Sequence, residues 1–306
     1  MNLDKYIALI KKGEVVAFPT ETVYGLGADA WNPSAIQKVF KIKGRPSDNP
    51  LIVHVSNLEQ VLDFVISIPK EAQELIDAFW PGSLSIILPK KPEVLDSVTA
   101  GLNTVAIRMP DHPIALNFIS KTGPLVAPSA NTSGNPSPTK ANHVLQDFGS
   151  DFPVIDGEST HVGLESTVID LSEGEPTILR PGSISRKQIE DVLGNGIHES
   201  FFTKLVQPKS PGQKYSHYKP NAEVKWLDEN DNLSDKAILF LLTESDHTAP
   251  NQVNYDGDLA LLARELYDRF RQADLEGYSK IAIQTFNDSD HSIVPALLNR
   301  INRAIS

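Results

Sequence analysis

The sequence predicts an α/β protein with a large mixed sheet followed by a smaller parallel sheet. Over the first two hundred residues, short apolar runs alternate with amphipathic runs and with many Pro and Gly corners. After an aperiodic stretch, the rest of the chain has the order strand, helix, strand, helix. A length of 306 residues is long for one domain, for which about 150 residues is common. We therefore expect a large first domain at 1–200, a linker at 201–222 and a small second domain at 223–306.

Helix signals are clearest at the N-terminal ends. Asn2 can cap a first helix that ends at Gly13, and Asn32-Pro33 begins a second helix that runs to about Lys43. Further starts have the capping-box form at Ser56-Asn57-Leu58-Glu59 and at Ser185-x-x-Gln188, and another helix is expected near 70–79. Strands are expected at 15–18, 22–27, 51–55, 84–88, 104–108, 125–127, near 154, at 167–171 and at 177–179.

The stretch 200–222 has neither a helical nor a strand period. It contains three prolines, but also Tyr215, His217 and Tyr218, and a simple spacer has little use for aromatic side chains. Beyond it we expect a strand at 236–242, a helix at 258–275, a strand at 281–284 and a helix at 292–304.

Composition restricts the classes of function. With 40% apolar and 22% charged residues the chain is typical of globular proteins, and no apolar run is long enough to span a membrane. The N-terminus lacks the features of a signal peptide, and zero cysteines exclude disulfides and thiolate zinc sites. We expect a cytoplasmic protein.

Charge is distributed unevenly along an acidic chain. The net charge of −11 argues against a protein that coats nucleic acid through bulk attraction. However, residues 37–47 and 200–222 carry lysines or arginine and no acid. Either these are two solvated segments, or they gather positive charge for a small polyanion.

Lys43 and Arg45 follow the C-terminal end of a predicted helix. The C-terminal end of a helix dipole is negative and repels anions. A bound anion would therefore have to be attracted by the charges of Lys43 and Arg45 themselves. The alternative is that cations at the helix end only satisfy its dipole, which accounts for Lys41 or Lys43 but poorly for Arg45, since Arg45 lies beyond the break at Gly44.

Polar side chains also occur within and after other strands. Arg108 lies in an apolar run, where it either pairs with a core acid such as Glu165 or faces a ligand carboxylate. His54, taken alone, is more often a satisfied core residue. Hydroxyl and amide groups cluster at strand ends, where they are either ordinary turn residues or an anion-binding concavity. They are Ser129-Ala130-Asn131, Ser166-Thr167 and Arg180-Pro181-Gly182.

One motif is misleading. Gly25-Leu26-Gly27-Ala28-Asp29-Ala30 matches the dinucleotide fingerprint, but the next helix starts too late, at Asn32, to point at a pyrophosphate. We expect a tight turn there and no nicotinamide site. The histidines have no metal-ligand spacing, so no metal site of the protein's own is expected.

In combination and order, these segments make the chain resemble the threonylcarbamoyl-AMP synthase family in its two-domain form. The matching segments are P-T-E-T-V-Y-G-L (19–26), K-G-R-P (43–46), P-L-I-V-H (50–54), R-M-P (108–110), P-S-A-N-x-S-G (128–134), E-S-T-V (165–168), R-P-G (180–182) and S-P-G-x-K-Y-x-H-Y-x-P (210–220).

The resemblance implies a fold and a reaction. The fold is a YrdC-type twisted mixed sheet with flanking helices, plus a small Rossmann-like α/β domain. The reaction is nucleotidyl transfer: L-threonine, bicarbonate and ATP give threonylcarbamoyl-AMP and pyrophosphate, with Mg²⁺ carried by the ATP. The product would pass to a tRNA threonylcarbamoyl transferase for modification of an adenosine, and direct tRNA binding stays an open alternative.

The resemblance also assigns residues. It implies catalytic roles for Lys43, Arg45, Ser129 and Asn131. It implies ATP contacts for Arg45, Asn49, Thr104, Asn131, Thr139, Arg180 and Tyr218. It implies L-threonine contacts for Thr22, Tyr24, His54, Arg108, Ser129 and Ser166. We expect the linker to close as a lid that adds Lys214, Tyr215, His217 or Tyr218.

Three alternatives remain open from the sequence: a double-stranded RNA or tRNA-binding module on this fold, a carbamoyl-transfer enzyme that shares the YrdC-type domain, and a nicotinamide oxidoreductase. The missing cysteines count against the second, since such enzymes usually add zinc-finger segments.

Overall fold

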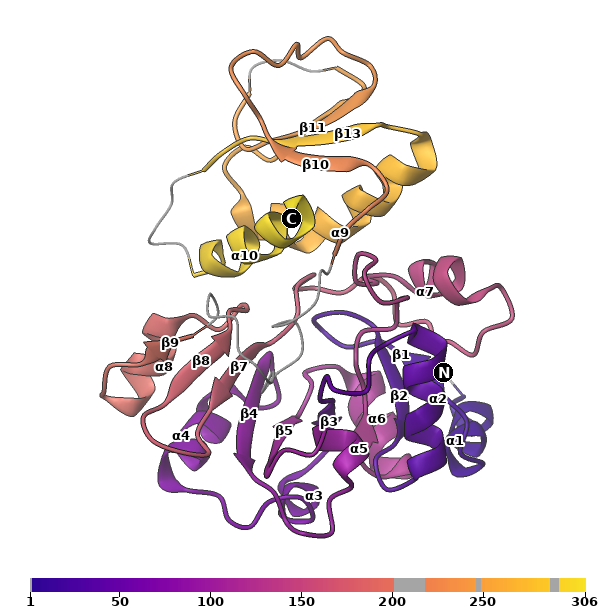
Figure 1. The fold of residues 1–306 in the computed structure, drawn as a ribbon, viewed down its shortest axis with the longest axis vertical. Coiled ribbons are helices and arrows are strands. Elements are labelled where there is room, and N and C mark those ends of the chain that lie inside the picture. Colours follow the sequence, from indigo (N-terminus) through magenta and orange to yellow (C-terminus); the bar gives the residue numbers. More distant parts are fainter. Residues whose placement is uncertain (1, 201–217, 246–248, 287–291) are drawn as a thin grey trace.

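The protein consists of two α/β units stacked on each other (Figure 1). The computed structural model describes residues 2–200, 218–245, 249–286 and 292–306. Most of the expected linker, with Lys214, Tyr215 and His217, lies outside these residues. Among the described helices, none is both long and apolar enough to cross a membrane.

The first unit is built on a nine-stranded mixed sheet. Its strand order is β1-β2-β6-β3-β5-β4-β7-β8-β9. The strands are β1 (Val16–Phe18), β2 (Gly25–Asp29), β3 (Ile52–His54), β4 (Leu84–Pro89), β5 (Thr104–Arg108), β6 (Leu125–Val126), β7 (Thr167–Asp170), β8 (Thr177–Arg180) and β9 (His198–Glu199). The flanking helices are α1 (Asp4–Lys11), α2 (Pro33–Lys43), α3 (Leu58–Leu62), α4 (Lys70–Phe79), α5 (Asp96–Thr99), α6 (Pro113–Thr122), α7 (Ala141–Phe148) and α8 (Arg186–Leu193).

Capping residues explain where several helices begin and end. The Asn32 side chain accepts hydrogen bonds from the first turn of α2, and Gly44 ends that helix with a left-handed φ of 61°. The expected capping box of α8 is present at Ser185 and Gln188. For α3 the expected cap is wrong: Asn57 caps the helix, and Ser56 instead contacts the Gln60 side chain.

The expected tight turn at Gly25 and Gly27 is also wrong, because both glycines lie in β2. The Phe18 ring of β1 covers this strand, and a Cβ on Gly27 would lie 2.9 Å from Phe18 Cε1. Glycine is therefore required by close packing between adjacent strands. Since no helix begins at these glycines, the dinucleotide-binding geometry is absent from this segment.

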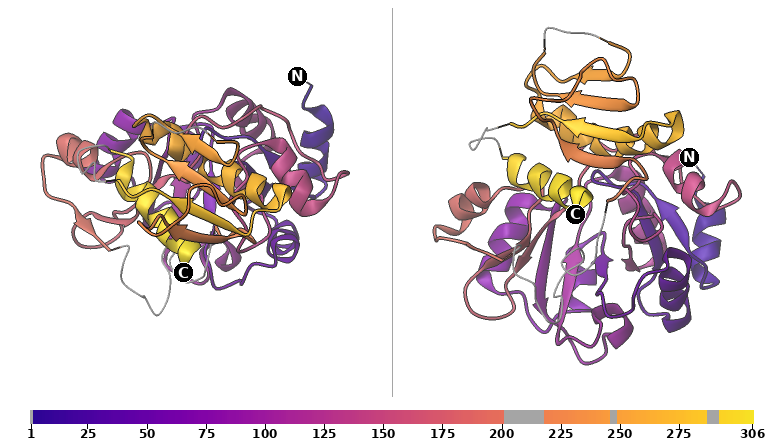
Figure 2. Two further views of the ribbon diagram at one scale, coloured as in Figure 1. Left: turned by 90° about the horizontal axis from the view of Figure 1, so that it is seen from above. Right: turned by 45° about the horizontal axis from the view of Figure 1, so that its top comes forward.

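The second unit contains a four-stranded parallel sheet in the order β10-β13-β11-β12. Its elements are β10 (Glu223–Trp226), β11 (Ile238–Leu242), β12 (Gln252–Asn254), α9 (Leu259–Glu276), β13 (Lys280–Ile283) and α10 (Val294–Ile305). Helices α9 and α10 lie between this sheet and the first unit (Figures 1 and 2). The expected class, a large mixed sheet plus a small Rossmann-like domain, is confirmed.

The sheet topology brings several polar residues together at the same end of neighbouring strands. Strands β3 and β5 are parallel, so their last residues, His54 and Arg108, are direct partners. Strand β7 begins where β8 ends, with Val168 opposite Arg180, and β4 begins opposite Thr167. The segment that precedes β7 reaches the same end. Strand β6 is antiparallel to β3, so the segment that follows β6 lies toward the start of β3 instead. One pocket is lined by Ile52, His54 and Ser129 together, so the candidate site lies over a face of the sheet between these two ends.

Candidate active site

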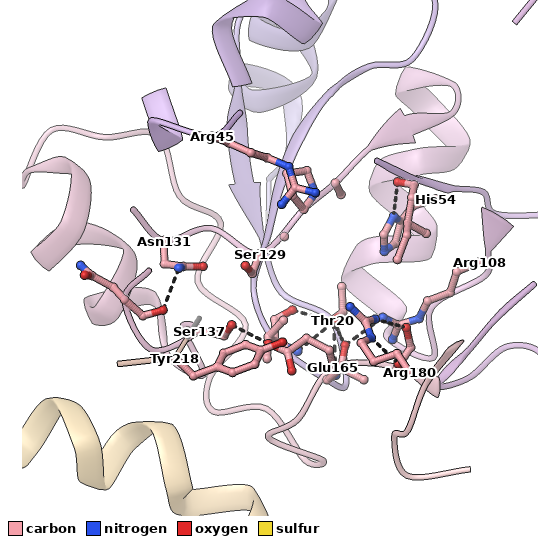
Figure 3. A pocket seen from close by; sticks show the side chains of 18 residues that line it. Thr20, Arg45, His54, Arg108, Ser129, Asn131, Ser137, Glu165, Arg180 and Tyr218 are labelled. Carbon is pink, nitrogen blue, oxygen red and sulfur yellow. Dashed lines mark hydrogen bonds between the residues drawn. The ribbon is translucent and has the colours of Figure 1, made fainter. Parts of the chain in front are cut away.

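A pocket lies over this face of the large sheet (Figure 3). Its walls come from seven separate stretches of the first unit and from one residue, Tyr218, next to the second unit. The lining residues are Thr20, Thr22, Val23, Gly25, Arg45, Ile52, His54, Arg108, Ala127, Pro128, Ser129, Asn131, Asn135, Ser137, Glu165, Ser166, Arg180 and Tyr218.

Three arginines dominate the electrostatics of the pocket. Arg45 enters from one wall, and Arg108 and Arg180 lie together on another (Figure 3). Glu165 is the sole carboxylate among the described lining residues. The pocket therefore carries a surplus of positive charge, although the whole chain is acidic.

Arg45 is held from behind by backbone carbonyls. Its Nε and Nη2 donate to the carbonyl oxygen of Asn49 at 3.4 and 3.3 Å, and Nη2 donates to that of Pro50 at 2.9 Å. These contacts fix the guanidinium on the loop that follows α2, and the side chain is buried.

Arg108 has a buried acid partner, and that partner is Glu21. Its Nη2 lies 2.5 Å from Glu21 Oε1, as an ion pair without hydrogen-bond geometry. Its Nη1 donates to Thr22 Oγ1 at 2.9 Å and its Nε to the Gly82 carbonyl at 3.1 Å. The core acid that the sequence offered as an example, Glu165, is paired elsewhere, and Arg108 also lines the pocket.

Arg180 and Ser166 form a second polar unit. The Arg180 Nε donates to the Ser166 carbonyl and its Nη2 to Ser166 Oγ, each at 3.0 Å. Ser166 Oγ is also 2.8 Å from Ser85 Oγ. Burial lowers the pKa of Arg180 to about 10, so the guanidinium is still cationic at neutral pH.

His54 is neutral in the folded protein. Burial, with a smaller contribution from Arg108, lowers its pKa to about 3. Its Nδ1 lies 3.2 Å from the Ile52 carbonyl, which acts as an acceptor, so Nδ1 carries the proton. The Nε2 atom is then left as a hydrogen-bond acceptor on a ring that lines the pocket.

Lys43 and Arg45 have different environments. Lys43 does not line the pocket; its Nζ donates to the carbonyls of Ser129 and Asn131, both at 2.6 Å. Burial and the nearby Arg45 hold its pKa well below the usual range. Lys43 therefore ties α2 to the Ser-Ala-Asn loop, which in turn presents Ser129 and Asn131 to the pocket.

Nine of the residues expected from the sequence meet in this pocket. They are Thr22, Arg45, His54, Arg108, Ser129, Asn131, Ser166, Arg180 and Tyr218. Five others are outside its lining: Lys43, Asn49, Thr104, Thr139 and Tyr24.

Lys43 is described above, and the other four residues outside the lining make the following contacts. Thr104 begins β5, at the opposite end from Arg108. The Tyr24 hydroxyl donates to the Glu158 carbonyl at 2.7 Å and accepts from the Gly157 amide. The Thr139 amide donates to His143 Nδ1. Asn49 contributes its carbonyl to Arg45.

Sequence reasoning missed several lining residues, above all Glu165 as a member of the site. Glu165 stands in the E-S-T-V motif, which was a usable signal. Its partners gave none: Ser137 lies in a polar loop, and Tyr267 and Arg300 lie on helices of the other unit more than a hundred residues away.

Comparison with known proteins places this chain. A family model described as "Telomere recombination", which covers the Sua5, YciO and YrdC proteins, matches residues 8–182. A second, described as "Threonylcarbamoyl-AMP synthase, C-terminal domain", matches residues 184–306. The threonylcarbamoyl-AMP synthase of Bacillus subtilis is 42% identical over 97% of this chain and 91% of its own length. The chain belongs to the threonylcarbamoyl-AMP synthase family. The family expected from the sequence is thereby confirmed.

Other relatives agree with that membership. The threonylcarbamoyl-AMP synthase of Pyrococcus abyssi is also 42% identical, over 96% of this chain and 91% of its own length. The crystal structure of Pyrococcus abyssi Sua5 complexed with L-threonine superposes with a TM-score of 0.89 at 38% identity, and the match covers 99% of this chain and 94% of that one. Both α/β units of this family member thus superpose together on one solved chain.

Proposed function

We propose that this chain condenses L-threonine, bicarbonate and ATP into threonylcarbamoyl-AMP and pyrophosphate. The observation that carries the proposal is the convergence of Arg45, Arg108 and Arg180 in one pocket lined by hydroxyl and amide groups. Such a site suits two anionic partners, a triphosphate and an amino-acid carboxylate. A nicotinamide oxidoreductase has no support, since the glycine motif lies within a strand.

The arrangement of the lining residues suggests a division of the pocket. Arg108, Thr22, His54 and Ser166 would hold threonine, with Arg108 on its carboxylate and the neutral His54 Nε2 as an acceptor. Arg45, Ser129, Asn131, Arg180 and Tyr218 would contact ATP and the reacting centre. The contacts of Lys43, Asn49 and Tyr24 support indirect roles for them, through the backbone segments and the Arg45 side chain that they hold. ATP contacts of Thr104 and Thr139 stay a prediction.

The chemistry needs positioning more than it needs a protein nucleophile. The threonine amine and bicarbonate combine into a carbamate with loss of water. A carbamate oxygen then attacks the α-phosphorus of ATP, and the bond to the leaving pyrophosphate breaks. Both reactants are negative, so fixed cations that neutralise charge in the transition state would supply most of the acceleration.

Magnesium is proposed as part of the ATP substrate. The pocket acid, Glu165, already accepts hydrogen bonds from Ser137, Tyr267 and Arg300 and is poorly placed to act as a metal ligand. The ion would therefore be held by phosphate oxygens and water.

We also propose how the chain is organised. Residues 1–200 would form the catalytic domain, residues 201–222 would form a lid over the pocket, and residues 223–306 would form a second domain. Tyr218, at the described end of that lid segment, lines the pocket and supports the idea.

The product would be handed to a tRNA-modifying transferase, because a mixed anhydride is prone to hydrolysis in free solution.

Pyrophosphate release from ATP tests the proposal. We expect release that requires threonine and bicarbonate together, and a threonylcarbamoyl adenylate detectable by mass spectrometry. Release that is indifferent to threonine would overturn it. Carbamoyl phosphate in place of threonine and bicarbonate is the control for a carbamoyl-transfer enzyme on the same fold, and it should give no product.

A further inference from the structure

The carboxylate of Glu165 is held from two domains at once. Its Oε1 accepts a hydrogen bond from Ser137 Oγ at 2.6 Å, within the first domain. Its Oε2 accepts from Tyr267 Oη at 3.0 Å and from Arg300 Nε at 2.8 Å, and these donors lie on α9 and α10. In Figure 3 Glu165 and Ser137 are joined at the side of the pocket where Tyr218 lies, and a C-terminal helix passes nearby.

Arg300 connects two segments of the pocket wall. Besides its bond to Glu165, its Nη2 donates to the Pro181 carbonyl at 3.0 Å. Glu165 precedes Ser166, and Pro181 follows Arg180. Ser166 and Arg180 are the two residues that hydrogen-bond to each other in the pocket. One guanidinium thus joins the segment that carries Ser166 to the segment that carries Arg180. It is completely buried, with 0% exposure.

The backbone of α9 also lies directly against this wall. A Cβ on Gly163 would lie 2.4 Å from the Cα of Arg264, and Gly163 has a φ of +81°. Only glycine is compatible with this contact. The helix that carries Tyr267, α9, therefore contacts the chain at Gly163, two residues before Glu165. This backbone contact fixes the distance between α9 and the pocket wall.

The aromatic side chains complete the connection. Tyr267 stacks on Tyr218 with ring centroids 5.3 Å apart, and the Arg300 guanidinium lies 5.5 Å from the centre of the Tyr218 ring. Tyr218 itself lines the pocket. The same two C-terminal residues therefore contact the pocket through Glu165 and through Tyr218.

We propose that Tyr267 and Arg300 of the C-terminal domain are positioning residues for the reaction: by fixing Glu165, they set the positions of Ser166 and Arg180 in the pocket. The inference rests on the proposed function and adds to it a role for the second domain. Neither residue touches the space where substrates would bind. The competing explanation is that both residues only dock one domain on the other.

Tyr267→Phe is the mildest test, because it removes one hydroxyl and keeps the stacked ring. Tyr255→Phe is a matched control: Tyr255 is another buried tyrosine of the C-terminal domain, and its hydroxyl reaches Glu265, 3.4 Å away on α9. We expect kcat/KM for pyrophosphate release to fall about tenfold in Tyr267→Phe. The control should keep wild-type activity, and the two variants should melt at similar temperatures.

Arg300→Gln supplies a readout that docking alone would not change. In the native protein burial would raise the pKa of Glu165, but Arg300 and then Arg180 lower it to about 2, so it is ionised at all working pH values. Loss of Arg300 removes the strongest opposing charge and raises that pKa. The groups facing Glu165 are Arg180, Arg300, Arg303, Lys43, Tyr218, Tyr267 and Ser137.

The activity of Arg300→Gln relative to wild type should then increase as pH rises over about pH 5 to 8, because the titration of the threonine amine and of bicarbonate affects both proteins equally. Arg300→Lys should recover part of the loss at neutral pH. Lys140→Met is the interface control: Lys140 pairs with Asp268 at 2.7 Å across the same interface, and His143 still contacts Asp268 when it is removed. This control should behave as wild type.

The outcomes separate the two hypotheses. If the wild type releases pyrophosphate only with threonine and bicarbonate, the proposed function stands. If Tyr267→Phe then matches Tyr255→Phe, the positioning role is wrong, whatever happens to Arg300→Gln. An inactive wild type would instead reject the proposed function. Should Arg300→Gln fail to fold, the Tyr267→Phe comparison still decides.

Discussion

The guanidinium of Arg108 lies 2.5 Å from the carboxylate of Glu21, and both side chains are buried beside the pocket. The fixed acid balances the arginine when no substrate is bound. An incoming carboxylate would meet an arginine that is already oriented by Thr22 and Gly82. The pair therefore combines a stabilising role with a proposed binding role.

Substitutions can separate these roles. Arg108→Gln alone leaves Glu21 as an unpaired buried charge and should cost about 3–5 kcal/mol in the free energy of unfolding. Arg108→Gln combined with Glu21→Gln should recover most of that stability but not threonine-dependent activity. Urea unfolding and pyrophosphate release measure the two effects. Full activity in the double variant would contradict the assignment of Arg108 to threonine.

Arg45 is expected to be the main phosphate ligand of its loop. Arg45→Ala should lower kcat/KM for pyrophosphate release by about a hundredfold, since a fixed cation at the transferring phosphoryl group is lost. Arg45→Lys should recover only part, because an ammonium cannot bind two oxygens in a fork. Unchanged release in Arg45→Ala would contradict the role.

Lys43 should act differently from Arg45, since its ammonium is used by the carbonyls of Ser129 and Asn131. Lys43→Met should lower stability by a few kcal/mol, roughly 1–3 for each carbonyl left without a donor. Competitive inhibition by pyrophosphate should weaken less in Lys43→Met than in Arg45→Ala. Equal weakening would mean that Lys43 binds phosphate directly.

His54 should make the fold sensitive to acid. Its pKa is lowered from 6.5 to about 3 in the folded protein, so the unfolded chain binds the proton more readily. Its contribution to stability is therefore complete above pH 6.5 and is lost progressively as the pH falls toward about 3. His54→Gln should flatten the decline of the urea midpoint with falling pH. An unchanged slope would show that His54 is already neutral in the unfolded state or protonated in the folded one.

Polar residues that interrupt or end apolar runs drew attention to Arg108, Ser166 and Arg180 in the sequence, although the pattern left a purely structural role open for each. The family resemblance supplied their expected roles, and the structure places all three in the lining of one pocket. Helices with explicit caps, such as those starting after Asn32 and Ser185, were also predicted.

The failures have physical causes. Gly25 and Gly27 have the composition of a turn, but they lie in β2, where the Phe18 ring leaves no room for a Cβ at Gly27. The distance of Thr104 from the pocket depends on which end of β5 faces it, which composition does not specify. Contacts of Glu165 with Tyr267 and Arg300 cross a domain interface, and nothing in either helix distinguishes these two residues from other core positions.

The shared carboxylate of Glu165 limits how this molecule can be recombined. A chimera that joins the first domain to a foreign second domain should assemble a working centre only when the donor supplies an arginine and a tyrosine in register with a glycine at position 163. Substitutions at Glu165 and Gly163 should therefore be accompanied in evolution by substitutions at Tyr267 and Arg300, so that the two halves of the gene are inherited as one functional unit.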